Sequence, residues 1–182
     1  MCGRYIIFTS EEYQEMKSIL KEIEKHFKAG IGFESSHEVF PGTSVPVIRS
    51  EGNRAFYEMS KWGLPMYNSS KLIINARGET INEKRMFHNL KPLVFPSNGY
   101  FEWHEKVKYF LKPKDLDTMY FAGLYDKDNN SVIITTQSSE SISNIHDRMP
   151  VILNREKARI WMETKDYSLI LPYLNMIYKK AV

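Results

Sequence analysis

The sequence predicts an α+β fold: one compact domain with a largely antiparallel, barrel-like β-sheet core and helices at its periphery. Its 182 residues fit one domain and can bury a proper core. A hydrophobic content of 42% with 26% charged residues is typical of a globular protein. Many short strand patterns, with helical periodicity mainly near the chain ends, favour antiparallel pairing. We expect a single domain over residues 1–182, without linkers or repeats.

The N-terminal segment predicts a strand followed by an amphipathic helix. Residues 4–9 have the composition of a short strand. Thr9 and Glu12 have the spacing of a capping box, which marks a helix start. Apolar side chains then recur every three or four residues and give the helix one apolar face: Tyr13, Met16, Leu20, Ile23 and Phe27. Gly30 and Gly32 are expected to end this helix.

The middle of the chain predicts the strands of the sheet. Their expected ranges are 45–48, 53–60, 92–95, 99–103, 107–112, 119–125, 131–136 and 151–153. The Asp128-Asn129-Asn130 triplet is a turn signal between two of these strands. Residues 82–89 and 140–146 allow short helices.

The end of the chain predicts a helical tail over residues 162–182. Asn154 is suited to cap a helix that runs to about Met162. A terminal helix is expected at about 166–178, with an interruption at Pro172.

Composition limits the class of protein. No apolar run reaches about 18 residues, and no basic segment precedes an apolar one at the start, so we expect neither a membrane span nor a secretory signal. A single cysteine fits a reducing cytoplasm. The five histidines lack metal-ligand spacing, and nucleotide-binding glycine patterns are absent, so we predict no metal and no cofactor. The net charge of +3 permits a polyanion partner but also simply favours solubility.

Cys2 is the first candidate for chemistry because removal of Met1 would leave it at the terminus. A terminal cysteine carries an amine and a thiol on adjacent carbons, with reference pKa values of about 8 and about 8.5. Such a 1,2-aminothiol captures aldehydes as a five-membered thiazolidine. The alternative is a buried, inert cysteine that packs as a small apolar residue.

Several polar residues lie in segments that are too apolar for ordinary surface loops. Asn75 and Arg77 follow two isoleucines, and Glu102 lies between Phe101 and Trp103. Burial would raise the pKa of Glu102 and suit it to acid/base catalysis, although strand alternation also allows it to be exposed. His146 could transfer protons near neutral pH. Structural alternatives are a turn for the asparagine, a lysine partner for the glutamate and a satisfied core histidine.

Six motifs occur in order along the chain. They are Met1-Cys2-Gly3-Arg4-Tyr5, Trp62-Gly63-Leu64-Pro65, Asn75-Ala76-Arg77-Gly78-Glu79-Thr80, Pro96 with Gly99-Tyr100-Phe101-Glu102-Trp103, Ala122-Gly123-Leu124-Tyr125, and Ile145-His146-Asp147-Arg148-Met149-Pro150-Val151-Ile152-Leu153. This set resembles the SRAP family, the SOS-response-associated peptidase domain that also occurs in abasic-site shielding proteins. The resemblance covers residues 2–161.

The resemblance implies a protein of the DNA-damage (SOS) response. It would sense abasic sites in single-stranded DNA, act as a monomer, and form a covalent protein–DNA linkage in the cytoplasm, at the nucleoid when bound to DNA. The implied catalytic residues are Cys2, Asn75, Glu102 and His146. The implied DNA contacts are Arg4, Arg77, Arg148 and a loop that wedges beside the lesion, made of Trp62, Gly63, Leu64 and Pro65.

The sequence also departs from the family pattern. An Arg-Cys pair of the family is Pro92-Leu93 here, so Cys2 is the single candidate nucleophile. The Trp62 loop is one residue shorter than usual, and Glu38 replaces an expected asparagine beside the proposed DNA cleft. Two alternative functions stay open. An N-terminal cysteine can serve a peptidase, including self-removal of Met1, and aromatic and basic side chains can bind single strands without covalent chemistry.

Overall fold

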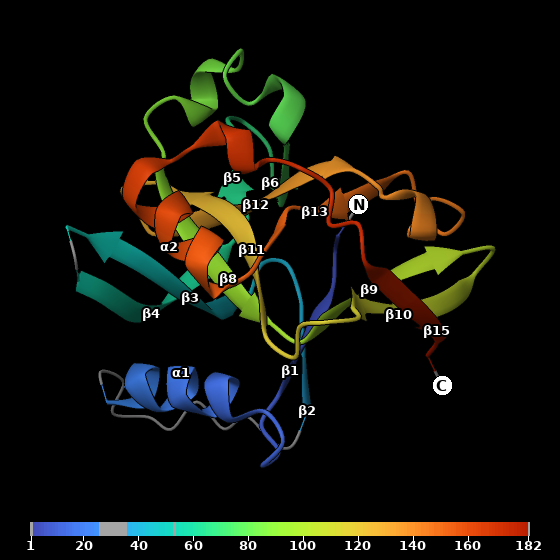
Figure 1. Cartoon of the computed structure of the whole chain (residues 1–182). Helices are drawn as coiled ribbons and strands as arrows, with labels where there is room; N and C mark the ends of the chain where they lie inside the picture. Colours follow the sequence, from blue (N-terminus) through green and yellow to red (C-terminus); the bar gives the residue numbers. More distant parts are fainter. Residues whose placement is uncertain (1, 26–35, 53, 182) are drawn as a thin grey trace.

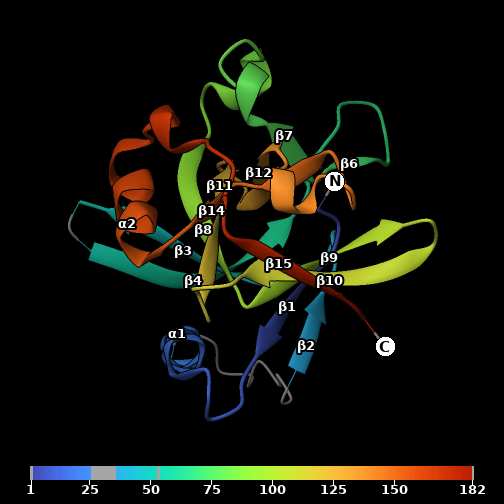
Figure 2. The same cartoon turned by 45° about the vertical axis from the view of Figure 1, so that its right-hand side comes forward.

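The computed structural model describes residues 2–25, 36–52 and 54–181 and builds them around two main β-sheets (Figure 1). The first, here called the small sheet, has the strand order β15-β10-β9-β1-β2 and is antiparallel throughout. Figure 2 brings its strands β9, β10 and β15 forward. The strand bounds are Tyr5–Phe8 (β1), Ser36–Val39 (β2), Gly99–His104 (β9), Val107–Pro113 (β10) and Met176–Lys180 (β15).

The second sheet closes on itself. Its pairings run β12-β4-β3-β8-β11 and return to β12, while β7 and β13 pair with β12 and β14 pairs with β11. The bounds are Ser44–Glu51 (β3), Arg54–Trp62 (β4), Asn75–Arg77 (β7), Lys91–Ser97 (β8), Met119–Tyr125 (β11), Asn130–Gln137 (β12), Arg148–Pro150 (β13) and Ile152–Leu153 (β14). The pairings of β12 with β4 and β7 are parallel and the others are antiparallel, so the predicted barrel-like core is confirmed.

Shorter elements complete the chain. A two-stranded ribbon joins β5 (Leu64–Pro65) to β6 (Leu72–Ile73). Single 3-10 turns stand at Gly78–Thr80, Arg85–Phe87, Glu140–Ile142 and Tyr167–Leu169, so the short helices expected near 82–89 and 140–146 shrink to one turn each. In the described part of the chain, no helix is long and apolar enough to cross a membrane.

Two α-helices pack against the outside of the barrel. Helix α1 (Gln14–Glu24) buries Met16, Ile19, Leu20 and Ile23, which confirms the amphipathic helix. The predicted capping box is wrong, because the helix begins later and Tyr13 takes the N-cap position without a side-chain cap. Phe27 and the stop expected at Gly30 and Gly32 lie outside the described residues.

Helix α2 (Arg155–Thr164) covers β8, β11 and β3 (Figure 1). The side chain of Asn154 accepts the Lys157 N–H, as expected for an N-cap. Trp161 is fully buried and its indole N–H donates to the carbonyl oxygens of Leu93 and Gly123. These bonds tie the helix to two barrel strands.

The predicted helical tail over residues 162–182 is wrong. Helix α2 ends at Thr164 with Lys165 in the left-handed conformation, and β15 later pairs with residues Tyr109 to Pro113 of β10. Pro172 prevents a continuous helix, and the unpaired edge of β10 offers five residues backbone partners instead. A long-range pairing thus overrides the local helical pattern.

The pairing of β1 with β9 divides the small sheet into two faces. Tyr5 lies opposite Tyr100, and both side chains are fully buried against the barrel. Because side chains alternate along a strand, Glu102 shares the inner face with Tyr100, whereas Phe101 and Trp103 point to the outer face. Cys2 lies just before β1, where the small sheet meets the barrel.

Candidate active site at Cys2

Cys2 lies fully buried at the junction of the two sheets. The Asn75 side-chain amide donates to the carbonyl oxygen of Cys2 at 2.9 Å, and the Phe101 N–H donates to the carbonyl oxygen of Arg4 at 2.9 Å. Burial raises the pKa of the Cys2 thiol, and the negative charge of Glu102 raises it further. In this state the thiol is protonated and a weak nucleophile.

Glu102 is buried beside Cys2, with 5% of its surface exposed. The sequence left open whether this side chain faces solvent. The structure shows that Glu102 is on the buried face of β9, whereas its neighbour Trp103 on the outer face is 41% exposed. Burial raises the pKa of the Glu102 carboxyl, and the positive charge of His146 works against this rise. The carboxyl therefore keeps its proton to a higher pH than a surface glutamate, as an acid catalyst requires.

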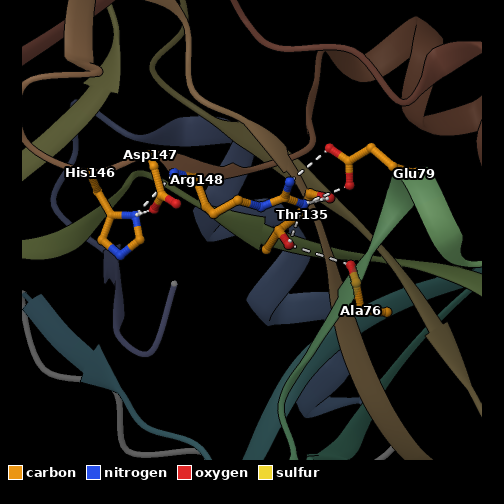
Figure 3. A network of polar contacts seen from close by, with 6 residues as sticks. All are labelled: Ala76, Glu79, Thr135, His146, Asp147 and Arg148. Atoms are coloured by element: carbon orange, nitrogen blue, oxygen red, sulfur yellow. Dashed lines mark hydrogen bonds and ion pairs between the residues drawn. The ribbon is translucent and has the colours of Figure 1, made fainter.

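His146, in the turn before β13, lies close enough to the Glu102 carboxyl for its charge to act on it. Figure 3 shows the imidazole ring beside Asp147 and Arg148. Its Nδ1 lies 2.9 Å from the backbone nitrogen of Arg148 and 2.8 Å from a carboxylate oxygen of Asp147. A neutral ring that accepts the Arg148 N–H at Nδ1 carries its proton on Nε2, whereas a protonated ring can pair with Asp147. The two neighbours thus suit both states of a proton carrier.

Strand β7 brings Asn75 and Arg77 to this site. It pairs in parallel with β12, and alternation places both side chains on one face. Asn75 Oδ1 is buried and lacks a hydrogen-bond partner among the described residues, although the amide nitrogen of the same side chain holds Cys2. Arg77 is exposed. One side chain therefore has a vacant acceptor near Cys2, and the other presents a cation to solvent.

The tryptophan loop differs from its predicted role. Trp62 is fully buried, and its indole N–H donates to the carbonyl oxygen of Ile74 at 2.9 Å. Gly63 and Leu64 are buried as well, whereas Pro65 is exposed. Contrary to the expectation, the indole and Leu64 belong to the core and cannot wedge beside a lesion in this structure.

Arg148 also departs from its predicted role as a DNA contact. Its two terminal nitrogens donate to the two carboxylate oxygens of Glu79 at 2.7 and 2.9 Å (Figure 3). One of them also donates to the carbonyl oxygen of Thr135 at 2.8 Å. With 8% of the residue exposed, this guanidinium holds β13 to the segment after β7 and does not face solvent.

Comparison with known proteins gives the site its context. The sequence matches the family described as SOS response associated peptidase (SRAP) over residues 1–179. The chain belongs to the SRAP family. This SRAP match extends past residue 161 and includes most of β15, so the family domain takes in the tail.

Two curated relatives and one solved structure illustrate the SRAP likeness. The chain is 33% identical to "Abasic site processing protein YoqW" of Bacillus subtilis, over 95% of this chain and 88% of that protein. It is 28% identical to "Abasic site processing protein YedK" of Escherichia coli, over 89% and 79%. A crystal structure of a protein from Bacteroides thetaiotaomicron superposes with a TM-score of 0.78 at 23% identity, over 98% and 91%, which shows the shared fold.

Some residues of this SRAP site were missed by sequence reasoning. They are the hydroxyls of Tyr5 and Tyr100, which are buried without a hydrogen-bond partner in the described chain, and whose pKa values are raised by burial and further by Cys2. The sequence offered a signal for both tyrosines, since they lie within the motifs that contain Cys2 and Glu102. Glu38, expected beside the DNA cleft, accepts from Arg4 at 3.3 Å and also pairs with Lys108.

The described residues contain no group of three histidine, cysteine, aspartate or glutamate side chains that could hold a metal ion. The titratable groups around Cys2 include the Glu102 carboxyl, the His146 imidazole and the hydroxyls of Tyr5 and Tyr100. The site is therefore suited to nucleophilic and acid/base chemistry.

Arg148→Ala is expected to lower the free energy of unfolding by about 2–3 kcal/mol. The change leaves the carbonyl of Thr135 without its donor and removes the partner of Glu79, whose pKa Arg148 holds below its usual range. Chemical denaturation measures this loss. Arg155→Ala is the control because this arginine is 86% exposed. Unchanged stability combined with weaker DNA binding would restore Arg148 as a DNA contact.

Proposed function

We propose that this SRAP protein processes abasic sites in single-stranded DNA by forming a covalent crosslink through Cys2. The observation that carries the proposal is the meeting of Cys2, Asn75, Glu102 and His146, which come from four separate segments of the chain. The names of the curated relatives support the choice of substrate. Abasic deoxyribose supplies the aldehyde that a 1,2-aminothiol captures.

Removal of Met1 activates the site. While Met1 is attached, the nitrogen of Cys2 is an amide and cannot form an imine, and burial keeps the thiol protonated. After removal, Cys2 carries a free α-amine beside the thiol. The vacant Oδ1 of Asn75 is suited to accept a hydrogen bond from this amine and direct its lone pair at the sugar.

Opening of the sugar ring is the first chemical step. The closed ring is a hemiacetal, and opening moves a proton from the C1′ hydroxyl to O4′ as the C1′–O4′ bond breaks. Glu102 is suited to donate the proton to O4′ because its raised pKa lets the carboxyl keep its proton to a higher pH than an ordinary glutamate does. The carboxylate then takes the proton of the former hydroxyl, which leaves an aldehyde at C1′ and restores the acid.

The amine and the thiol then react in turn at C1′. The α-amine adds to the aldehyde, and loss of one water gives an imine. Addition of the thiol sulfur to the imine carbon closes the thiazolidine, and the thiol proton ends on the nitrogen. His146 is suited to carry these protons, because its neighbours Arg148 and Asp147 match its neutral and charged forms.

The remaining features of the proposal concern the partner and the setting. We propose that the protein acts as a monomer, because the four reacting or orienting groups need no residue from a second copy. Removal of the base leaves nothing to flip out of a stack, so a single strand can present the bare sugar directly. We place the protein in the cytoplasm, at the nucleoid when it is bound to DNA.

A denaturing gel tests the proposed function against its two alternatives. Processed protein is mixed with a single strand that carries one abasic site, heated in denaturant and separated. A heat-stable shifted band is the expected result. Cleavage of a peptide substrate without a shifted band would favour the peptidase activity in the family description. Binding that is lost on denaturation would favour a non-covalent single-strand binder.

Arg77→Ala is expected to weaken binding to intact and abasic single strands by similar factors. A phosphate contact releases counterions, so the slope of log K against log salt should fall by roughly 0.7 for the lost contact. Fluorescence anisotropy at several salt concentrations measures the slope. Arg159→Ala is the control, since its side chain is 74% exposed on α2. A fixed slope with slower adduct formation would instead place Arg77 against the reacting sugar.

A further inference from the structure

We propose that the outer face of the small sheet binds the single DNA strand as it leads away from the lesion. This inference rests on the proposed function. Six aromatic side chains lie along this face and are here called the aromatic row: Tyr13, Phe8, Phe110, Phe101, Trp103 and Phe40. Phe101 is 5% exposed and lies under Lys108, so the other five rings reach the surface.

Ring contacts connect the first four members of the aromatic row. The ring centroids of Tyr13 and Phe8 lie 5.1 Å apart, those of Phe8 and Phe110 6.3 Å, and those of Phe110 and Phe101 5.7 Å. Register explains the row, because Phe101 and Phe110 lie directly opposite each other on β9 and β10. The sheet therefore presents neighbouring rings across three strands.

Cations lie over these rings and connect them to the last two members of the row, Trp103 and Phe40. Lys179 lies 5.7 Å from the Phe110 ring and Lys108 lies 3.9 Å from the Phe101 ring. Arg4 lies 4.9 Å from the Trp103 ring and 4.5 Å from the Phe40 ring. Alternating cations and rings are the arrangement that binds phosphates and bases of a single strand together.

The acidic groups on this face do not cancel its charge. Glu38 is shared by Arg4 and Lys108. At the Tyr13 end, the exposed Asp117 lies 3.8 Å from Lys112, and Glu12 is the third acidic group. Lys179 adds a further cation over the centre of the row. The face therefore keeps a positive surplus that matches a polyanion and would repel a basic partner.

The surface between the rings is hollowed. Two cavities of about 250 and 360 Å³ share Phe8, Phe110 and Lys179 in their walls. Each is open to solvent and largely apolar, so it offers a base a ring to stack on and a lysine for the adjoining phosphate. The lysine shared by both cavities also distinguishes this face from the core of a protein interface, where lysine is depleted.

The aromatic row begins beside the reaction site. Arg4 is two residues from Cys2, and its carbonyl oxygen is fixed to β9 by the Phe101 N–H. Cys2, just before β1, and Glu102, on the inner face of β9, lie buried beneath this sheet. A strand whose abasic sugar reaches Cys2 can thus pass Arg4 at the sheet edge and continue over the outer face.

The test compares strands with a tail on one side of the lesion. One set has an abasic site with a nine-nucleotide thymidine tail 5′ of it, a second has the tail 3′ of it, and a third is a trinucleotide with a central abasic site. Anisotropy gives Kd at 4 °C, and denaturing gels give the rate of adduct formation. Lys179→Glu and Phe110→Ala are compared with Arg54→Glu and Phe56→Ala, a cation–ring pair on β4.

We expect one of the two tails to strengthen binding of the wild type at least tenfold over the trinucleotide. Lys179→Glu and Phe110→Ala should each reduce the gain in affinity from the tail by roughly tenfold, the effect of one lost stacking or cation contact. Crosslinking of the trinucleotide should stay unchanged, and the β4 controls should resemble the wild type. Lys179→Glu replaces a surface side chain, so it tests the face even if Phe110→Ala fails to fold.

Several results would overturn the inference. The first is that the wild type binds tailed strands and the trinucleotide with equal Kd. The second is that Lys179→Glu keeps the full effect of the tail on Kd. The third is that the wild type sediments as a dimer and Lys179→Glu as a monomer. Absence of adduct with every strand would instead count against the proposed function. A tail effect without adduct would keep the face as a DNA surface, so the two proposals fail separately.

Discussion

Cys2→Ser is expected to eliminate the heat-stable adduct while the protein still binds single-stranded DNA. A hydroxyl is a far weaker nucleophile than a thiolate, and the oxazolidine that it would form hydrolyses readily. Asn75 bonds to the backbone carbonyl oxygen at this position, so the substitution leaves that contact in place. The readouts are a denaturing gel for the adduct and anisotropy for binding.

A matched control separates the two nucleophiles of Cys2. A variant with one alanine inserted between Met1 and Cys2 keeps the thiol but turns the amine into an amide. It should also form no stable adduct, because no imine can precede closure. An undiminished heat-stable band from Cys2→Ser would refute thiazolidine chemistry. A band from the inserted variant alone would mean that the thiol acts without the amine.

Glu102→Gln is expected to slow adduct formation on a normal abasic site by roughly 10²–10⁴-fold, the usual contribution of a general acid. The amide cannot donate a proton to O4′ and take one back. In the wild type the rate should fall as pH rises through the raised pKa of Glu102, because the carboxyl then loses its proton. In the variant this limb of the pH profile should be absent.

His146→Ala provides the contrast. It should change transfer of the finished adduct to a competing trap at least as much as it changes formation. Time courses of both steps measure this. A wild-type rate from Glu102→Gln would leave the glutamate a structural partner. Equal slowing of both steps by both variants would mean that the two groups titrate as one unit.

The same glutamate should lower stability as pH rises above its unfolded pKa. The folded state keeps the Glu102 proton to a higher pH than the unfolded chain does, since burial raises the pKa. Between the unfolded and folded pKa values, the folded state binds more protons, so the free energy of unfolding falls as pH rises. Glu102→Gln removes this loss, and its thermal midpoint should exceed that of the wild type at pH 8 while its activity is lower. Such a trade-off is typical of functional sites.

Local patterns predicted the parts of the fold that depend on local interactions. The apolar spacing of α1 and the cap of α2 are visible in neighbouring residues. Alternation also predicted that Glu102 lies opposite Phe101 and Trp103. It could not show which face is buried, because that depends on the barrel that the inner face covers.

Contacts between distant segments account for the misplaced residues. Trp62 stands beside a glycine and near a proline, which suggests a loop, yet β4 extends to it and Ile74 accepts its N–H. The partner of Arg148 is Glu79, 69 positions away in the chain. Family motifs record that such residues recur, but only the structure distinguishes a side chain that holds strands together from one that faces DNA.

The burial of Cys2 relates the removal of Met1 to the order in which the chain is synthesised. The groups that enclose its thiol include residues of β9, which begins at Gly99, so Cys2 cannot be buried before that strand has left the ribosome. At 5–20 residues per second, synthesis as far as this strand takes roughly 5–20 s. An aminopeptidase that acts in this interval meets Cys2 before the barrel encloses its thiol. Removal of Met1 during synthesis would therefore precede assembly of the site.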